Sequence, residues 1–152
     1  MTDTPSLIFF AGSAREDSVN KKIARVAAAK AAAADAKATF IDLRDYPMPL
    51  YDGDLEEREG LPAAAVELKA LLRGSDGFFI ASPEYNSSLP PLLKNTIDWV
   101  SRKATPDEPP LAAYKGKVAA IAAGSPGAMG GMRVLVALRM LLGNIGVHVV
   151  PQ

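Results

Sequence analysis

The sequence has 152 residues, of which 49% are apolar and 22% charged, and its seventeen basic residues balance seventeen acidic ones. This predicts one globular domain (1–152) with a sizeable core, excludes an intrinsically disordered chain, and argues against nucleic-acid or anionic-membrane partners. The absence of cysteine and the single histidine exclude disulfides, thiolate nucleophiles, cysteine-held clusters and His-rich metal sites, so we expect no metal.

The amino-terminal residues, MTDTPS, include an acidic residue and no basic stretch, and the apolar run at 7–12 is too short for the core of a signal peptide. No apolar run approaches the roughly 20 residues of a membrane-spanning helix. We therefore expect a cytoplasmic protein.

Short continuous apolar runs alternate with stretches of helical periodicity along the chain. The runs predict five strands, at 7–11, 38–41, 78–81, 118–123 and 147–150. Apolar residues three and four apart predict four helices: one after each of the first two runs, one at 94–102 and one at 134–145. The segments expected to be surface loops, rich in proline, glycine and acidic residues, are 46–62 and 105–110.

Strands that alternate with helices in this way require right-handed crossovers, which favours an α/β fold with a doubly wound sheet. Five strands favour the flavodoxin-like order 2-1-3-4-5 in a parallel sheet. A ligand of such a sheet binds beyond the carboxyl ends of the strands. The loops after the first, third and fourth strands therefore form the candidate site.

The loop after the first strand, GSAREDSVN at 12–20, runs from a buried strand directly into a helix. Gly12 permits a tight turn, and the helix start offers free N–H groups at the positive end of its dipole, which suits a phosphate. The dinucleotide fingerprint and the nucleotide P-loop are both absent, and a plain turn with Ser18 as helix cap also fits. The side chains suited to an anion are Ser13, Arg15, Ser18 and Asn20.

The loop after the third strand, SPEYNSSLPP at 82–91, is stiffened by three prolines. Tyr85 and Asn86 stand where a flat heterocycle would be stacked and hydrogen-bonded. An ordinary, partly exposed tyrosine is the alternative for Tyr85. In the helix that follows, we expect Trp99 to lie in the core.

The loop after the fourth strand, GSPGAMGGMR at 124–133, opens the strongly amphipathic helix expected at 134–145. Its four glycines allow backbone N–H groups to approach a ligand closely, although a flexible lid or a helix-packing loop also fits. Arg133 is suited either to a phosphate or to a neighbouring chain.

Together these three segments resemble the NADPH-dependent FMN reductase family, which includes bacterial quinone, chromate and azo-dye reductases of flavodoxin-like fold. The resemblance rests on GSAREDSVN, SPEYNSSLPPLLKNTIDWVS at 82–101 and GSPGAMGGMR, and the middle segment is the most specific. The order of strands and helices agrees over nearly the whole chain.

The resemblance implies bound FMN, with NADPH or NADH as hydride donor. Ser13, Arg15, Ser18 and Asn20 would hold the FMN phosphate. The residues that would line the ribityl chain and the ring are Pro83, Glu84, Tyr85, Asn86 and Ser87. Ser125 and Gly127 would close the other side of the flavin. No basic cluster for a 2′-phosphate is evident, so the preference between NADPH and NADH stays open.

The chemistry implied is that of a cofactor, because the sequence offers no Ser-His-acid or Cys-His arrangement. His148 is expected inside the fifth strand and not at the site, and only Tyr85 and Asn86 are candidates for a catalytic contribution. NAD(P)H would give a hydride to the flavin, and the reduced flavin would pass electrons to a small acceptor such as a quinone, an azo compound or a metal oxyanion. Backbone N–H groups near 85–88 would stabilise the reduced ring.

Two other functions also fit a flavin-binding domain. One is a flavodoxin-type electron carrier, although the neutral charge argues against the acidic docking face of such carriers. The other is a non-enzymatic flavin-binding regulator.

A sheet of this order needs helices on both faces, yet the sequence ends directly after the fifth strand. Either residues beyond Gln152 or a partner subunit would cover the remaining face. The helix at 134–145 also has apolar residues beyond its main stripe, at Met132, Val136 and Met140. We therefore expect a homodimer or homotetramer with this helix among the contacts.

Overall fold

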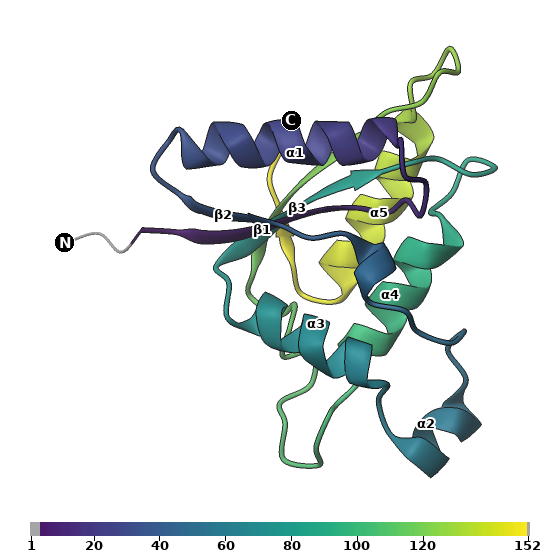
Figure 1. Cartoon of the computed structure of the whole chain (residues 1–152). Helices are drawn as coiled ribbons and strands as arrows, with labels where there is room; N and C mark the ends of the chain where they lie inside the picture. Colours follow the sequence, from purple (N-terminus) through teal and green to yellow (C-terminus); the bar gives the residue numbers. More distant parts are fainter. Residues whose placement is uncertain (1–3, 152) are drawn as a thin grey trace.

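The part of the chain that the computed structural model describes, residues 4–151, contains five parallel strands in one sheet of order β2-β1-β3-β4-β5 (Figure 1). The expected α/β class and strand order are thus confirmed. The strands are β1 (Ser6–Ala11), β2 (Lys37–Phe40), β3 (Gly77–Ser82), β4 (Val118–Ala123) and β5 (His148–Val149).

Helices cover both faces of the sheet, with α1 on one face and α3 and α4 on the other (Figure 1). Buried side chains of α5 join the same core cluster as those of α3 and α4, which places α5 on their face. The helices are α1 (Val19–Ala32), α2 (Gly53–Glu59), α3 (Ala63–Arg73), α4 (Pro91–Ser101) and α5 (Met132–Asn144), with a 3-10 turn at Leu43–Asp45.

The central strands have apolar side chains toward both helical layers. Ile8 and Phe10 of β1 belong to the larger core cluster with α3, α4 and α5. Phe9, between them, stacks on Phe79 of β3 at a ring-centroid distance of 5.8 Å. Successive strand residues point to opposite faces, so a strand buried on both sides is apolar throughout. This explains why the strands are continuous apolar runs.

The segment 46–62 was expected to be a loop, and this expectation is wrong in part, because α2 lies within it. The carboxylate of Asp52 caps this helix by accepting hydrogen bonds from the N–H groups of Asp54 and Leu55. No residue of α2 is buried, so the helix lacks the apolar stripe on which its prediction would depend. The preceding loop is fixed to α4, since Trp99 Nε1 donates to the Pro49 carbonyl at 2.8 Å.

Trp99 is fully buried, as expected for a core residue of α4. The helix itself starts earlier than the expected 94, at Pro91, because proline is well tolerated in the first turn of a helix.

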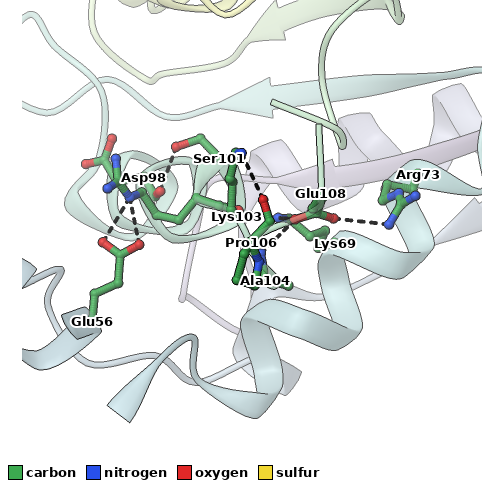
Figure 2. A network of polar contacts seen from close by, with 10 residues as sticks. Glu56, Lys69, Arg73, Asp98, Ser101, Lys103, Ala104, Pro106 and Glu108 are labelled. Carbon is green, nitrogen blue, oxygen red and sulfur yellow. Dashed lines mark hydrogen bonds and ion pairs between the residues drawn. The ribbon is translucent and has the colours of Figure 1, made fainter. Parts of the chain in front are cut away.

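The segment 102–110, between α4 and β4, is fastened to α3 by a buried polar network (Figure 2). The Glu108 carboxylate accepts hydrogen bonds from Lys69, from Arg73 at 3.1 Å and from the Ala104 N–H at 2.7 Å. Lys69 also donates to the Arg102 carbonyl. Because the strands are parallel and α4 runs back against them, this network lies at the amino ends of the strands, opposite the candidate site.

The face of the sheet that carries α1 is covered only in part. A largely apolar hollow of about 540 Å³ is lined by residues that include Phe9, Phe79, Ala120 and Val150. The expected continuation past Gln152 lies outside the described residues. None of the helices in residues 4–151 combines the length and the apolar character that spanning a membrane requires.

Candidate functional site

A cavity of about 470 Å³ opens beyond the carboxyl ends of β1, β3 and β4, where the three candidate loops meet. Most of the residues that the sequence analysis assigned to the cofactor line it: Ser13, Arg15, Ser18, Asn20, Pro83, Glu84, Tyr85 and Ser125. Asn86, Ser87 and Gly127 are not among the residues that line it, although each belongs to one of the same loops.

The first loop turns directly from the sheet toward α1. The Gly12 N–H donates to the Ala81 carbonyl at 2.9 Å, which continues the pairing of β1 with β3. A side chain at Gly12 would not fit, because its Cβ would lie 2.9 Å from that of Leu93. The hydroxyl of Ser13, which is 2% exposed, accepts the Arg15 N–H at 3.3 Å.

Ser18 precedes α1 with extended backbone dihedrals and is buried, but its hydroxyl makes no capping hydrogen bond. An ordinary capping role therefore does not account for Ser18, since a cap would accept an N–H of the first helical turn. The uncapped turn borders the cavity, where its N–H groups favour an anion.

The charged side chains at this end of the cavity differ in their partners. Lys22 forms an ion pair with Asp17 at 2.5 Å, and its hydrogen bond lowers the pKa of that carboxyl. Arg15 is exposed and has no carboxylate within ion-pair distance in residues 4–151. Arg15 is thus a cation at the cavity wall whose charge is available to a ligand.

Asn20 connects the first loop to the third. Its side-chain Nδ2 donates to the Gly124 carbonyl and its Oδ1 accepts the Gly124 N–H, both at 2.9 Å. Glycine lets Gly124 lie against α1 without displacing its side chains, because a Cβ there would lie 2.8 Å from the terminal Cδ1 of Ile23. No local sequence pattern indicates this contact, since the two residues are 104 positions apart.

The second loop contains a tight hairpin. Tyr85 and Ser88 exchange both backbone hydrogen bonds, at 3.1 and 3.0 Å, across Asn86 and Ser87. Both central residues have positive φ, 52° and 64°, as in a type I′ turn. The N–H groups of Tyr85 and Ser88 are therefore occupied, and those of Asn86 and Ser87 have no acceptor within residues 4–151.

Glu84 connects the second loop to the start of α5. Its Oε2 accepts the Val134 N–H at 3.0 Å, and a longer contact of 3.5 Å joins Arg133 Nη1 to Ser87 Oγ. Neither contact has a local sequence signal, because the partners are 50 and 46 positions apart.

The third loop reaches α5 through two glycines in the left-handed region. Gly130 has φ 59° and Gly131 has φ 90°, conformations that favour glycine. A Cβ on Gly131 would also lie 2.9 Å from that of Ala123, so the chain passes closely over the end of β4. Nearer β4, the Gly127 N–H donates to Ser125 Oγ at 3.2 Å.

A further ion pair at the same edge of the sheet was not anticipated from the sequence. Buried Lys21 pairs with Asp42, which follows β2, at 2.6 Å. Burial raises the pKa of Asp42, but its hydrogen bonds from Lys21 and the Arg44 N–H bring the pKa below its ordinary value. The pair fixes the first turn of α1 relative to β2.

The arrangement suits a ligand with an anionic end and a polar, flat body. Hydroxyls, a free guanidinium and helix N–H groups suit a phosphate, while Tyr85 and the neighbouring amides suit a planar ring. His148 lies in β5 and not among the residues that line the cavity. Within residues 4–151, no three His, Cys, Asp or Glu side chains are grouped to hold a metal ion.

The chain is similar to known proteins along nearly its whole length. The family model described as NADPH-dependent FMN reductase matches residues 5–152. A quinone reductase of Escherichia coli is 37% identical over 142 residues, which are 93% of this chain and 71% of that protein. An NAD(P)H-dependent FMN reductase of Pseudomonas aeruginosa is 34% identical over 97% of this chain and 75% of its own length.

A solved structure shares the same fold. FerB, a flavoenzyme NAD(P)H:(acceptor) oxidoreductase from Paracoccus denitrificans, superposes with a TM-score of 0.80 at 30% identity, over 98% of this chain and 76% of that one. The sheet order is thus that of a flavodoxin-like flavoenzyme. From the family match, the relatives and the fold together, the chain belongs to the NADPH-dependent FMN reductase family.

Proposed function

We propose that this oxidoreductase binds FMN in the cavity of about 470 Å³ and uses it to carry electrons from NADPH or NADH to a small acceptor of the quinone type. The observation that carries the proposal is the convergence of Ser13, Arg15 and Ser18 with Tyr85 at one cavity. Membership of the family supports the involvement of flavin and NAD(P)H.

The phosphate of FMN would lie at the uncapped start of α1. The Ser13 and Ser18 hydroxyls and the Arg15 guanidinium would bind it, together with the free N–H groups of the first turn. Asn20 has a second hydrogen on Nδ2 beyond the one that Gly124 accepts, and this hydrogen would also serve the phosphate.

The ring and the ribityl chain would be held by the second and third loops. Pro83, Glu84 and Tyr85 line the cavity from one side and Ser125 from another. Asn86, Ser87 and Gly127 are close to these residues in sequence, and we assign them to the rim.

FMN, when bound, would accept a hydride from NAD(P)H and pass the electrons to the acceptor. The protein supplies position and electrostatics. The free N–H groups of Asn86 and Ser87 are the donors suited to negative charge on the ring, since those of Tyr85 and Ser88 are already bonded. One open cavity that serves donor and acceptor in turn would give ping-pong kinetics.

The acceptor class follows from the relatives. The Escherichia coli relative is a quinone reductase, and flat quinones suit a stacking surface of this kind. Azo compounds and metal oxyanions are further candidates for the same reduced cofactor.

We also propose that the protein forms a homodimer or a homotetramer through α5. Met132, Val136 and Met140 are 56%, 72% and 72% exposed along one side of this helix. Apolar side chains exposed side by side in this way are typical of a subunit contact. Light scattering at micromolar concentration tests this: a dimer or tetramer mass is expected, and a monomer mass would contradict the proposal.

Binding of FMN and of riboflavin to the purified protein tests the phosphate site. FMN should bind at least tenfold more tightly, because charged hydrogen bonds of a phosphate contribute about 1.5–3 kcal/mol each in a desolvated site. Equal affinity for the two flavins would contradict the assignment of the first loop.

A further inference from the structure

The helix α5 begins without a capping side chain of its own. Gly131 occupies the N-cap position with φ 90° and contributes no side-chain hydrogen bond. The first N–H groups of a helix need acceptors from outside it. The acceptor for the buried Val134 is the Glu84 carboxylate, at 3.0 Å, from a loop 50 residues earlier in the chain.

This hydrogen bond fixes one end of the glycine loop, and Asn20 fixes the other. Gly124 is held by the two hydrogen bonds to the Asn20 side chain, both 2.9 Å. Between these ends, the hydrogen bonds of residues 125–131 in the described structure run within the loop or to the start of α5, such as Gly130 N–H to Gly127. The position of the loop over the cavity therefore depends on its two ends.

Glu84 also lies at the base of the hairpin in the second loop. It directly precedes Tyr85, and both residues line the cavity. Holding the Glu84 side chain against α5 therefore fixes the hairpin and the glycine loop relative to each other. The longer contact between Arg133 and Ser87, at 3.5 Å, joins the same two segments farther out.

We propose that Glu84 is a positioning residue, whose carboxylate couples the hairpin at 85–88 to the glycine loop by capping α5, and thereby sets the shape of the cavity that takes the flavin. This inference rests on the proposed function. Its chemical requirement is a hydrogen-bond acceptor at the end of the side chain, because the partner is a neutral backbone N–H.

The test compares Glu84→Ala, Glu84→Gln and, as a control, Glu57→Ala, which removes an exposed carboxylate from α2. FMN dissociation constants are measured by quenching of flavin fluorescence. Hydrogen exchange of segment 125–135 is measured on the protein without FMN, and thermal unfolding is followed by circular dichroism.

Glu84→Ala should raise the FMN dissociation constant about fivefold to tenfold, the effect of losing one hydrogen bond, and should speed hydrogen exchange across the glycine loop. Glu84→Gln retains an acceptor oxygen and should restore both values, while Glu57→Ala should match the parent protein. These results together support the positioning role.

Lower thermal stability of Glu84→Ala with unchanged FMN affinity would overturn the inference, because Glu84 would then cap α5 for stability alone. A Gln variant as impaired as the Ala variant would also overturn it, because charge and not hydrogen bonding would then be required. If the parent protein does not bind FMN, the proposed function and this inference fail together. If it binds FMN and the Ala variant binds equally well, the inference alone fails.

Discussion

Replacement of Glu108 by Gln tests the buried network that holds segment 102–110 on α3 (Figure 2). The side chains of Glu108 and Lys69 are each 4% exposed, so the substitution leaves the Lys69 ammonium buried without its counter-charge. Breaking a buried ion pair in this way costs about 3–5 kcal/mol. Glu108 accepts three hydrogen bonds, which places the expected loss in this range and not near the 0–1 kcal/mol of a surface pair.

The pH dependence of this loss has a defined sign. Burial raises the pKa of Glu108, but the hydrogen bonds from Lys69 and the Ala104 N–H, with the charge of Arg73, bring it below its ordinary value of 4.5. A carboxyl whose pKa is lower in the folded than in the unfolded protein stabilises the folded state at pH values above its unfolded pKa. This stabilisation is lost as the pH falls through the pKa of the group in the folded state. The difference in stability between parent and variant should therefore be full at pH 7 and shrink below about pH 4.

Urea denaturation followed by circular dichroism measures the free energy of unfolding of each protein. The matched control is Glu59→Gln, which removes an exposed partner of Arg58 and should change stability by less than about 1 kcal/mol. A Glu108→Gln variant no less stable than Glu59→Gln would refute the reasoning. So would a difference between parent and Glu108→Gln that grows toward acid pH.

Three further predictions concern the site and the assembly. Arg15→Ala should weaken FMN binding, measured by calorimetry, by about 1–3 kcal/mol, because a charged hydrogen bond to the phosphate is lost. An unchanged dissociation constant would show that Arg15 does not bind the phosphate. Asn86→Ala should shift the reduction potential of bound FMN and slow turnover. No change in either value would show that the hairpin at 85–88 does not contact the flavin ring. Val136→Glu places a charge on a 72% exposed apolar position of α5 and should lower the mass measured by light scattering to that of one chain. An oligomer of unchanged mass would exclude this side of α5 as the subunit contact.

The strands and most helices could be predicted from the sequence because apolar periodicity reflects burial. The strand order could be predicted because strands that alternate with helices favour a doubly wound sheet. The helix α2 could not, since none of its residues is buried and no stripe marks it. Its only local signals are the capping Asp52 and the terminating Gly60 with φ 75°, which also fit a turn.

The candidate site could be predicted as three loops because parallel strands place their carboxyl ends at one edge of the sheet. The contacts that join those loops could not. The hydrogen bonds from Asn20 to Gly124 and from Val134 to Glu84 connect residues 104 and 50 positions apart, and neither has a local pattern. The hairpin at 85–88 was missed for a different reason, because Asn-Ser is a weaker type I′ signal than Asn-Gly.

Anaerobic addition of NADPH to the FMN-loaded protein tests the central claim most directly. The flavin absorbance in the visible region should bleach with NADPH alone, with no protein partner added, and should return when a quinone is supplied. Bound flavin that stays oxidised with both NADPH and NADH would contradict the reductase function and would favour a carrier or a flavin-binding regulator.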